Sequence, residues 1–220
     1  MTVLVIAAHP DDEILGAGGA LARRVRAGDE VHAMVISEGA GSRYGDGMAE
    51  KLQAHARRAA AEIGFASLRF ESLQDQRLET LPLIELTQRL EAVIDELQPD
   101  NVYTHFPEDV NNDHRVVARA AWTACRPYRM PFVRRFLVFE TASSTEWAWP
   151  ITGSAFSPNH YVDISDTPDV KVRAMACYET ELREYPHPRS ERALRERAAF
   201  WGSHIGRLAA EPFCVLREIW

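Results

Sequence analysis

Two short groups of histidine and carboxylate residues stand out in the sequence because their side chains are ligands of divalent metals. The first is the run His9-Pro10-Asp11-Asp12-Glu13, and the second is the pair Asp113-His114. Zinc accepts imidazole and carboxylate ligands, and a catalytic zinc ion usually has three protein ligands and one open position. The residue types therefore favour a metal site in which His9 and Asp12 supply two ligands and His114 supplies the third.

The first group follows an apolar run at residues 3–8, which is typical of a strand buried on both faces. A helix is expected over about 13–27, so the group lies at the carboxyl end of a strand, where open parallel sheets bind ligands. A dinucleotide-binding turn is disfavoured, because GxGxxG is absent and three adjacent acids would repel a pyrophosphate. The same acids would attract a cation, although Asp11 or Asp12 could instead serve only as an N-cap.

The second group lies between an expected strand at 101–106 and an expected helix at 113–125. In a doubly wound sheet of order 3-2-1-4-5, the first and fourth strands are neighbours, about 4.8 Å apart. His114 could therefore reach an ion held by the first group, and Asp113 could orient an imidazole. In the structural alternative, Asp113 is an N-cap and His114 a surface residue.

The rest of the chain continues the alternation of strands and helices. Further strands are expected at 31–36, 67–71 and 133–139, further helices at 49–63, 81–97, 168–183 and 190–209, and loops at 37–48 and 141–160, the last with room for a short hairpin. This order predicts an α/β fold, a three-layer Rossmann-like sandwich around a mostly parallel central sheet. No linker or repeat interrupts it, so we expect one domain over residues 1–220.

The composition limits the classes of function. The chain has 220 residues, 46% of them hydrophobic and 26% charged, which is ordinary for a globular protein that folds without a metal. A net charge of −7 disfavours binding to nucleic acid. No apolar run reaches the length of a membrane span and no signal peptide is evident, so we expect a cytoplasmic protein without a membrane partner. The three cysteines match no zinc-finger spacing and are expected to be free thiols.

Together, His-Pro-Asp-Asp-Glu after the first strand and Asp-x-Asn-x-Asp-His-Arg at 109–115 resemble the PIG-L/LmbE family of zinc-dependent N-acetylglucosamine deacetylases. The similarity extends to Ser37-Glu38-Gly39 with Arg43, to Ile63-Gly64 and to Phe156-x-Pro158-Asn159-x-Tyr161. It implies an LmbE-like fold with a metal site at the C-terminal strand ends. It also implies a zinc ion held by His9, Asp12 and His114, with Asp11 as general base, and the homo-oligomers that relatives often form.

One departure from the family pattern concerns catalysis. Some members have His-x-Asp-His in the second motif, whereas this chain has Asn111 at the first histidine position. An amide donates a hydrogen bond but cannot carry a proton through a reaction, so we place Asn111 with the substrate-binding candidates. Zinc alone, His187 in the Pro-flanked segment 185–189, or Tyr161 could then assist the oxyanion. A surface loop for His187 and a core position for Tyr161 are the alternatives.

Several other residues are candidates for substrate contact. Arg43 follows a Gly-rich loop after the second strand, and Glu140 ends the fifth strand and could bind a hydroxyl or orient Arg43. Arg43 and Arg115 could bind sugar hydroxyls or a phosphate, or could be solvated arginines. Trp147 and Trp149 could stack on a sugar face, or could instead anchor a loop or an oligomer contact. The candidate catalytic residues are Asp11, Asp113 and His187.

These observations predict a metal-dependent hydrolase that removes the N-acetyl group from an N-acetylglucosamine-type sugar or its conjugate. Zinc would activate a water, and Asp11 would act as general base and then as general acid. Two alternatives stay open: an amidase for a non-sugar or thiol-conjugate amide, and a non-catalytic sugar or nucleotide-binding module. Iron(II) or cobalt would also suit the ligands.

Overall fold

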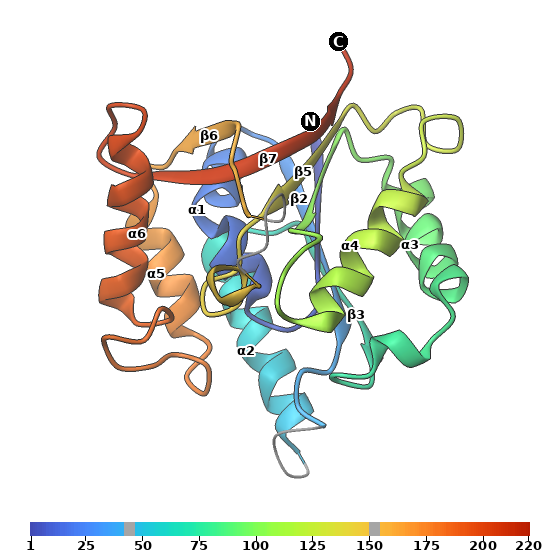
Figure 1. Cartoon of the computed structure of the whole chain (residues 1–220), viewed down its shortest axis with the longest axis horizontal. Helices are drawn as coiled ribbons and strands as arrows, with labels where there is room; N and C mark the ends of the chain where they lie inside the picture. Colours follow the sequence, from blue (N-terminus) through green and yellow to red (C-terminus); the bar gives the residue numbers. More distant parts are fainter. Residues whose placement is uncertain (42–46, 150–154) are drawn as a thin grey trace.

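The computed structural model describes residues 1–41, 47–149 and 155–220, and Arg43 therefore lies outside the described residues (Figure 1). A seven-stranded sheet has the order β3-β2-β1-β4-β5-β7-β6. Its first five strands are parallel to their neighbours, while β7 runs antiparallel to both β5 and β6. The strands are β1 Thr2–Ala7, β2 Glu30–Ser37, β3 Ser67–Leu73, β4 Asn101–His105, β5 Arg135–Phe139, β6 His160–Asp163 and β7 Ala210–Glu218.

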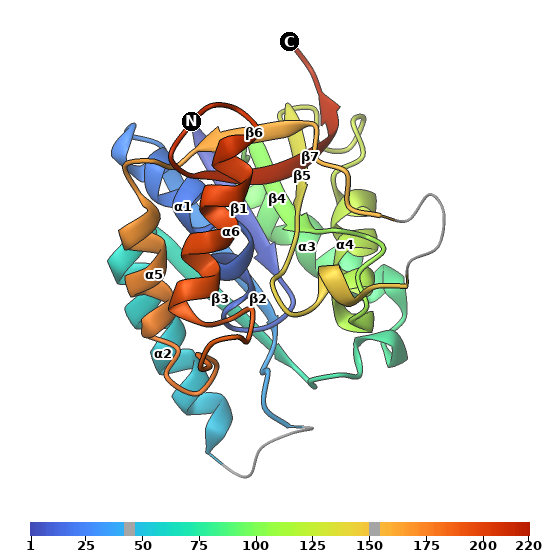
Figure 2. The ribbon, with the colours of Figure 1, turned by 60° about the vertical axis from the view of Figure 1, so that its left-hand side comes forward.

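Helices cover both faces of this sheet, which confirms the predicted three layers. The helices are α1 Asp12–Arg26, α2 Met48–Ile63, α3 Leu83–Leu97, α4 Asn112–Ala124, α5 Pro168–Ala176 and α6 Glu191–Ser203, with single 3₁₀ turns η1 Leu78–Thr80 and η2 Thr145–Trp147. Figure 1 shows α3 and α4 on one side and α1, α2, α5 and α6 on the other. α5 packs against α1 and α2, and α6 packs against α5 and β7 (Figure 2).

The central strand β1 separates two hydrophobic cores. Successive side chains of a strand point to opposite faces of its sheet. Val3 and Val5 accordingly pack into the core under α1 and α2, whereas Leu4 and Ile6 pack into the core under α3 and α4. A strand buried on both faces requires the continuous apolar run from which it was predicted.

The β1–β4 pairing brings the two sequence motifs together. β1 is parallel to β4, with Val3 opposite Asn101 and Val5 opposite Tyr103, so the carboxyl ends of both strands lie at the same edge. The predicted order of the first five strands, 3-2-1-4-5, is confirmed. The turns that follow β1 and β4 therefore meet at one site.

Helix α1 packs unusually close to the end of β5, and a glycine permits this. A Cβ atom at Gly16 would lie 2.1 Å from Cδ2 of Phe139, so no larger residue fits without movement. Asp12 and Glu13 lie in the first turn and basic residues lie in the last, an arrangement that complements the helix dipole. The packing fixes the N-terminus of α1, where the first motif lies.

The C-terminal third differs from the sequence-based prediction. The expected helices at 168–183 and 190–209 end earlier, at Ala176 and Ser203, and residues 210–218 form the unexpected strand β7 between β5 and β6. β7 contains Glu211 and Pro212, which are unusual in a strand between two neighbours, so its sequence does not have the pattern of a buried strand. Buried Glu211 is compensated by an ion pair with Lys171 (2.6 Å) and by the backbone N–H groups of Gly19 and Ala20.

The structure also bears on the cysteines and on the length of the helices. All three cysteines are free thiols, as predicted. None of the helices in the described ranges is both long enough and apolar enough to cross a bilayer.

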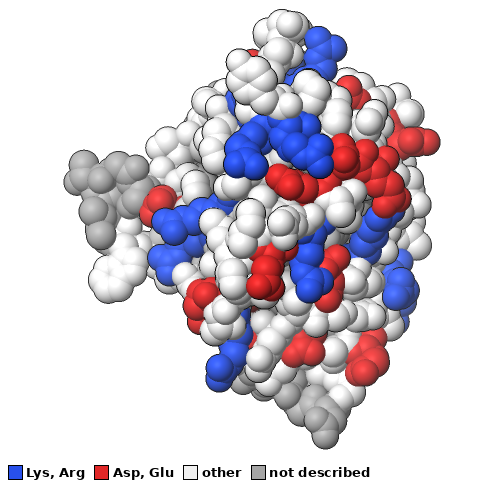
Figure 3. Space-filling model, turned by 90° about the vertical axis from the view of Figure 1, so that its right-hand side faces the viewer, with Lys and Arg blue, Asp and Glu red and all other residues white. Residues whose placement is uncertain are grey.

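On the face that α3 and α4 cover, acidic and basic side chains are interspersed (Figure 3), and ion pairs such as Arg126–Glu91 and Arg129–Asp95 join oppositely charged neighbours.

Candidate metal centre and catalytic site

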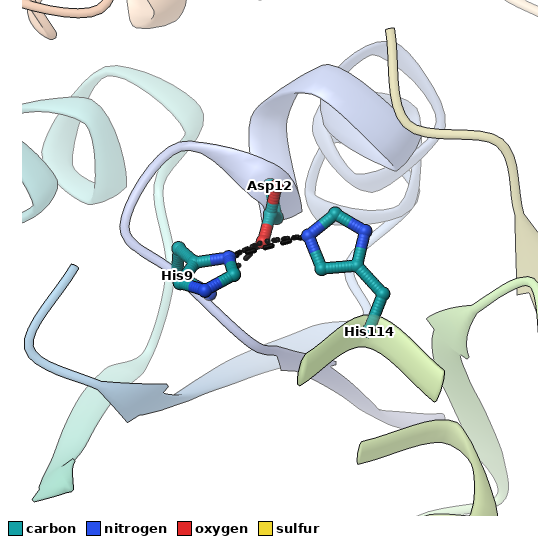
Figure 4. A group of neighbouring side chains, drawn as sticks. All are labelled: His9, Asp12 and His114. Atoms are coloured by element: carbon teal, nitrogen blue, oxygen red, sulfur yellow. Dashed lines mark hydrogen bonds and ion pairs between the residues drawn. The ribbon is translucent and has the colours of Figure 1, made fainter. Parts of the chain in front are cut away.

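His9, Asp12 and His114 converge at the carboxyl ends of β1 and β4 (Figure 4). His9 follows β1, Asp12 opens α1 and His114 lies in the first turn of α4. The Nδ1 atom of His9 lies 3.1 Å from Oδ2 of Asp12 and 3.2 Å from Nε2 of His114, and this last atom lies 3.2 Å from the same carboxylate oxygen. The three atoms thus form a nearly equilateral triangle.

This triangle fits the ligand set of a tetrahedral zinc ion. Ligand atoms at 2.0–2.1 Å from such an ion are separated from one another by about 3.3 Å. The three observed separations of 3.1 to 3.2 Å are close to that value. Two imidazole nitrogens and one carboxylate oxygen are also ligands that zinc prefers, and all three residues are largely buried.

The outer nitrogen of each imidazole faces a carboxylate. Nε2 of His9 lies 3.1 Å from Asp113 and 3.4 Å from Asp75, and Nδ1 of His114 lies 3.3 Å from Asp109. Each carboxylate can accept the ring proton on its side, which leaves the inner nitrogen lone pair for a metal. The prediction that Asp113 orients an imidazole thus applies to His9.

A second group, His9 with Asp75 and Asp113, also has its ligand atoms within 4.8 Å of one another. Asp113 is already engaged there, because its carboxylate accepts the backbone N–H groups of Gln76 (2.9 Å) and Leu78 (3.2 Å). Because Nε2 of His9 needs its proton for these carboxylates, we assign Asp75 and Asp113 to orienting the ring.

The charges of the site favour a cation at its centre. Burial by itself would lower the pKa of His9, but hydrogen bonds to Asp113 and Asp12 outweigh it and raise that pKa to about 10. His114 behaves similarly, since Asp12 and Asp109 raise its pKa against the effect of burial. Burial would raise the pKa of Asp12, but the charge of His114 outweighs burial and holds that pKa well below its usual value. The surrounding carboxylates stabilise positive charge at the place where a metal would bind.

His105, the last residue of β4, packs against the ring of His114. The two rings are stacked, with centroids 4.0 Å apart. Nε2 of His105 accepts the N–H of Ala8 (2.8 Å), so the proton lies on Nδ1, which is 3.1 Å from Thr141 Oγ1. Burial and then the charge of His114 lower the pKa of His105 to about 3. The ring is therefore a neutral support for His114.

Asp11 lies between the two ligands of the first motif and has a strained backbone. Its φ angle is 115°, in a region that residues other than glycine rarely adopt and that costs on the order of 1–3 kcal/mol. Its N–H donates to Glu13 (3.1 Å), which also accepts the hydroxyl of Tyr178. Its carboxylate forms an ion pair with Arg189 (2.7 Å). Burial raises the pKa of Asp11 well above its usual value, and the charge of Arg189 opposes that shift.

A cavity of about 560 Å³ opens over Asp11 and the two histidine ligands. This volume lies in the range of small-molecule sites. Its walls come from the segments that follow β1, β2, β3, β4 and β5 and from the segment between α5 and α6. The described lining residues are His9, Pro10, Asp11, Gly39, Leu52, Asp75, Gln76, Val110, Asn111, Asn112, His114, Ser143, Ser144, Trp147, Glu181, Arg183, His187 and Arg189.

Three of the residues singled out for substrate contact or oxyanion assistance line this cavity. Asn111 is the N-cap of α4, and its side-chain oxygen accepts the N–H of Asp113 (2.9 Å), so its NH₂ group is the part that can reach a ligand. His187 accepts the backbone N–H of Arg189 at Nδ1 (3.1 Å). Trp147 lies beside His187, with ring centroids 6.1 Å apart, and is 56% exposed.

Two other candidates lie elsewhere. Glu140 does not reach the cavity described here: its carboxylate binds Arg197 (2.6 and 2.7 Å) and the indole N–H of Trp201 (2.7 Å). A strand end was expected to present this acid to the ligand, but residues of α6 bind it instead. Tyr161 lies on β6 against Trp201 and His204 and is not among the described cavity residues, which agrees with the alternative of a packing role.

The two remaining candidates for substrate contact are Arg115 and Trp149. Arg115 donates to Asn112 (3.1 Å), and neither Arg115 nor Trp149 is among the described cavity residues. Sequence reasoning missed Asp75 and Arg189 as site residues. Arg189 belongs to the segment around His187, whereas Asp75 follows β3 without any motif to mark it.

Comparison with known proteins places the chain in a family. A family model described as PIG-L, GlcNAc-PI de-N-acetylase, matches residues 4–125, which is more than half of the sequence. The chain belongs to the PIG-L family. The match includes both motifs that form the His9–Asp12–His114 triangle, and it confirms the resemblance seen in the sequence.

A curated relative carries the likeness over most of the chain. The probable N-acetyl-alpha-D-glucosaminyl L-malate deacetylase 2 of Bacillus cereus is 28% identical over 191 residues, covering 81% of this PIG-L chain and 83% of the relative. The similarity therefore extends well beyond the segment that the family model matches.

Two solved structures share the fold. The N,N′-diacetylchitobiose deacetylase of Pyrococcus horikoshii is 21% identical to this chain, with a TM-score of 0.77, and the match covers 98% of this chain and 84% of the deacetylase. The 4-carboxy-2-hydroxymuconate hydratase GalB of Pseudomonas putida is also 21% identical, with a TM-score of 0.77, and the match covers 100% of this chain and 97% of the hydratase. Because a deacetylase and a hydratase match equally well, the fold does not decide the reaction.

Proposed function

We propose that this chain is a metal-dependent N-deacetylase that hydrolyses the acetamide group of an N-acetylglucosamine-type sugar or its conjugate. The observation that carries the proposal is the ligand triangle of His9, Asp12 and His114 in one cavity with Asp11. Membership of the PIG-L family and the deacetylase relative support this reaction over others of the same fold.

His9, Asp12 and His114 would hold the metal through Nδ1, Oδ2 and Nε2. A bound zinc ion would lower the pKa of a water molecule and polarise the amide carbonyl. The chain keeps both rings oriented, because Asp113 and Asp75 face the outer nitrogen of His9 and Asp109 faces that of His114.

Asp11 would carry the proton through both steps of the hydrolysis. Its carboxylate takes a proton from the water as the oxygen attacks the carbonyl carbon. The same proton then passes to the amide nitrogen as the C–N bond breaks, because an amide cannot expel an unprotonated nitrogen anion. The products are acetate and the amine, which takes up the remaining proton of the water as acetic acid ionises, and one carboxylate serves as base and then as acid.

Donors on the cavity wall would bind the rest of the substrate. Because Nδ1 of His187 accepts the N–H of Arg189, the neutral ring carries its proton on Nε2 and acts as a donor. Burial, followed by the charges of Arg189 and Arg183, lowers the pKa of His187 and keeps the ring neutral at pH 7. The NH₂ group of Asn111 is a second donor, and Trp147 offers a face for a sugar ring.

Acetate release and metal content together test this proposal. The purified chain is loaded with zinc, cobalt or iron(II) and incubated with N-acetylglucosamine, N,N′-diacetylchitobiose and N-acetylglucosaminyl malate. We expect release of acetate and free amine that a chelator abolishes and added metal restores. Hydrolysis of non-sugar or thiol-conjugate amides alone would contradict the sugar assignment. Metal binding with hydration of an unsaturated carboxylic acid and no amide hydrolysis would contradict the deacetylase assignment.

A further inference from the structure

We propose that Arg189 is a positioning residue that holds the carboxylate of Asp11 in its reactive orientation. The inference deepens the proposed function, since it concerns the residue to which that function assigns the proton transfers. Arg189 lies 178 positions from Asp11 in the sequence, in the segment between α5 and α6, and no motif identified it as a site residue.

The contacts of Arg189 join three segments around the cavity. Nη1 donates to Oδ2 of Asp11 at 2.7 Å and to Oε2 of Glu181 at 3.2 Å, while Nε donates to Oγ of Ser143 at 2.7 Å. Asp11 lies in the turn before α1, Ser143 follows β5, and Glu181 follows α5. The guanidinium therefore fixes the turn that carries Asp11 relative to two other walls of the cavity.

These contacts indicate positioning more than substrate binding. A guanidinium has five N–H donors in one plane, and at least three of them are directed at side chains that the structure describes. The side chain is only 17% exposed. Arg189 thus acts through Asp11, whose Oδ2 it holds, and Oδ1 is left as the oxygen that exchanges a proton with the water and the leaving amine.

Asp11 needs such a partner because acids surround it. Asp12 follows it in the sequence, Glu13 accepts its backbone N–H (3.1 Å), and Glu181 shares the Nη1 group of Arg189 with it. Its own backbone is strained. Without Arg189, the neighbouring carboxylates and the strained turn would direct the side chain of Asp11 away from the cavity. A displacement of about 1 Å at a reacting group can cost about 100-fold in rate.

The test compares Arg189→Met and Arg189→Lys with wild type, using the N-acetyl sugar that is hydrolysed fastest. We expect kcat to fall about 100-fold in Arg189→Met, with little change in KM, and Arg189→Lys to recover part of the loss because it restores the charge without the planar fork. Metal content should stay at the wild-type value and circular dichroism should show a folded protein, although the melting temperature should fall because Asp11 and Glu181 lose this partner. A rise in KM at constant kcat would instead make Arg189 a substrate-binding residue and overturn the proposal.

Arg192 provides a control three positions along the chain. Its guanidinium pairs with Glu196 (2.7 Å) and lies over the ring of Tyr185, and Arg192 is not among the described cavity residues. Arg192→Met removes a positive charge of the same kind close to Arg189 in the sequence. We expect its kcat to stay close to wild type, and an equal loss in both variants would assign the effect to charge in general and overturn the proposal.

A double-mutant cycle separates action through Asp11 from an independent role. In an Asp11→Asn background, Arg189→Met should cause no further loss of residual activity, because the carboxylate that Arg189 orients is already absent. Losses that multiply would overturn the proposal.

A crystal structure of Arg189→Met gives a readout that does not depend on activity. We expect the carboxylate of Asp11 to leave its wild-type position, and an unchanged Asp11 would contradict the proposal. A wild-type enzyme that hydrolyses no amide would refute the proposed function, whereas this crystallographic result would still decide the role of Arg189.

Discussion

Replacing Asp11 by asparagine separates proton transfer from metal binding at this site. Asparagine has nearly the same shape as aspartate but cannot take a proton from water. Asp11 is outside the triangle of ligand atoms that His9, Asp12 and His114 form. We therefore expect Asp11→Asn to keep stoichiometric metal and to lose most of its turnover.

The magnitude follows from the two roles assigned to Asp11. General acid–base catalysis by one positioned group contributes about 10²- to 10⁴-fold, and we expect a loss of about 10³-fold in kcat, or about 4 kcal/mol. The effect on folding should be small, because the lost ion pair with Arg189 is offset by removal of a buried charge, and Glu181 still binds Arg189.

The assay measures acetate release and metal content on the same preparations of Asp11→Asn and Asp12→Asn. The two acids are adjacent, equally buried and differ in the proposed role. Asp12→Asn should lose metal, and Asp11→Asn should keep it. Turnover of Asp11→Asn within tenfold of wild type would refute the assignment of Asp11 as the base, a limit set by the smallest contribution of about 10²-fold expected for such a group.

Three other predictions follow from contacts around the site. Asp113→Asn should weaken zinc binding by about 10- to 100-fold, measured by competition with a chromogenic chelator, because the carboxylate that orients His9 is lost. Zinc affinity should rise with pH between pH 7 and 9, and His9 alone should contribute up to about tenfold per unit, because its pKa in the metal-free protein is raised to about 10 and zinc must displace that proton. Calorimetry in buffers of different ionisation enthalpy would count the released protons, and an affinity independent of pH would contradict the prediction. Glu140→Ala should lower the free energy of unfolding by about 3 kcal/mol in a denaturant titration, because Arg197 and Trp201 lose the carboxylate that they bind. KM should stay unchanged, because these contacts lie away from the cavity. A raised KM would restore Glu140 as a substrate contact.

The fold was predictable wherever one local pattern determined an element. The apolar run of β1 is buried on both faces, and the alternation of strands and helices required a parallel sheet with covered faces. β7 was missed because its pattern contains Glu211 and Pro212. Glu211 is tolerated there only because Lys171 and the backbone of α1 bind it, and these contacts are tertiary.

In the candidate site, too, the predictable residues are those that a local motif marks. His9, Asp12 and His114 could be predicted because two motifs follow strands that lie side by side in this topology. Asp75 could not, because it follows β3 in a segment that carries no motif. Arg189 could not, because the segment 185–189 was singled out only for His187 and nothing local indicates the contact with Asp11. Glu140 shows the opposite case: its place at the end of β5 suggested the cavity, but in the structure Arg197 and Trp201 of α6 bind its carboxylate.

Metal analysis of the wild type and a His114→Ala variant tests the central claim most directly. The claim is that one divalent cation binds between His9, Asp12 and His114. After loading with zinc and exhaustive dialysis, the wild type should retain one equivalent of metal, and His114→Ala, still folded by circular dichroism, should retain almost none. Full occupancy in the folded variant would contradict the account.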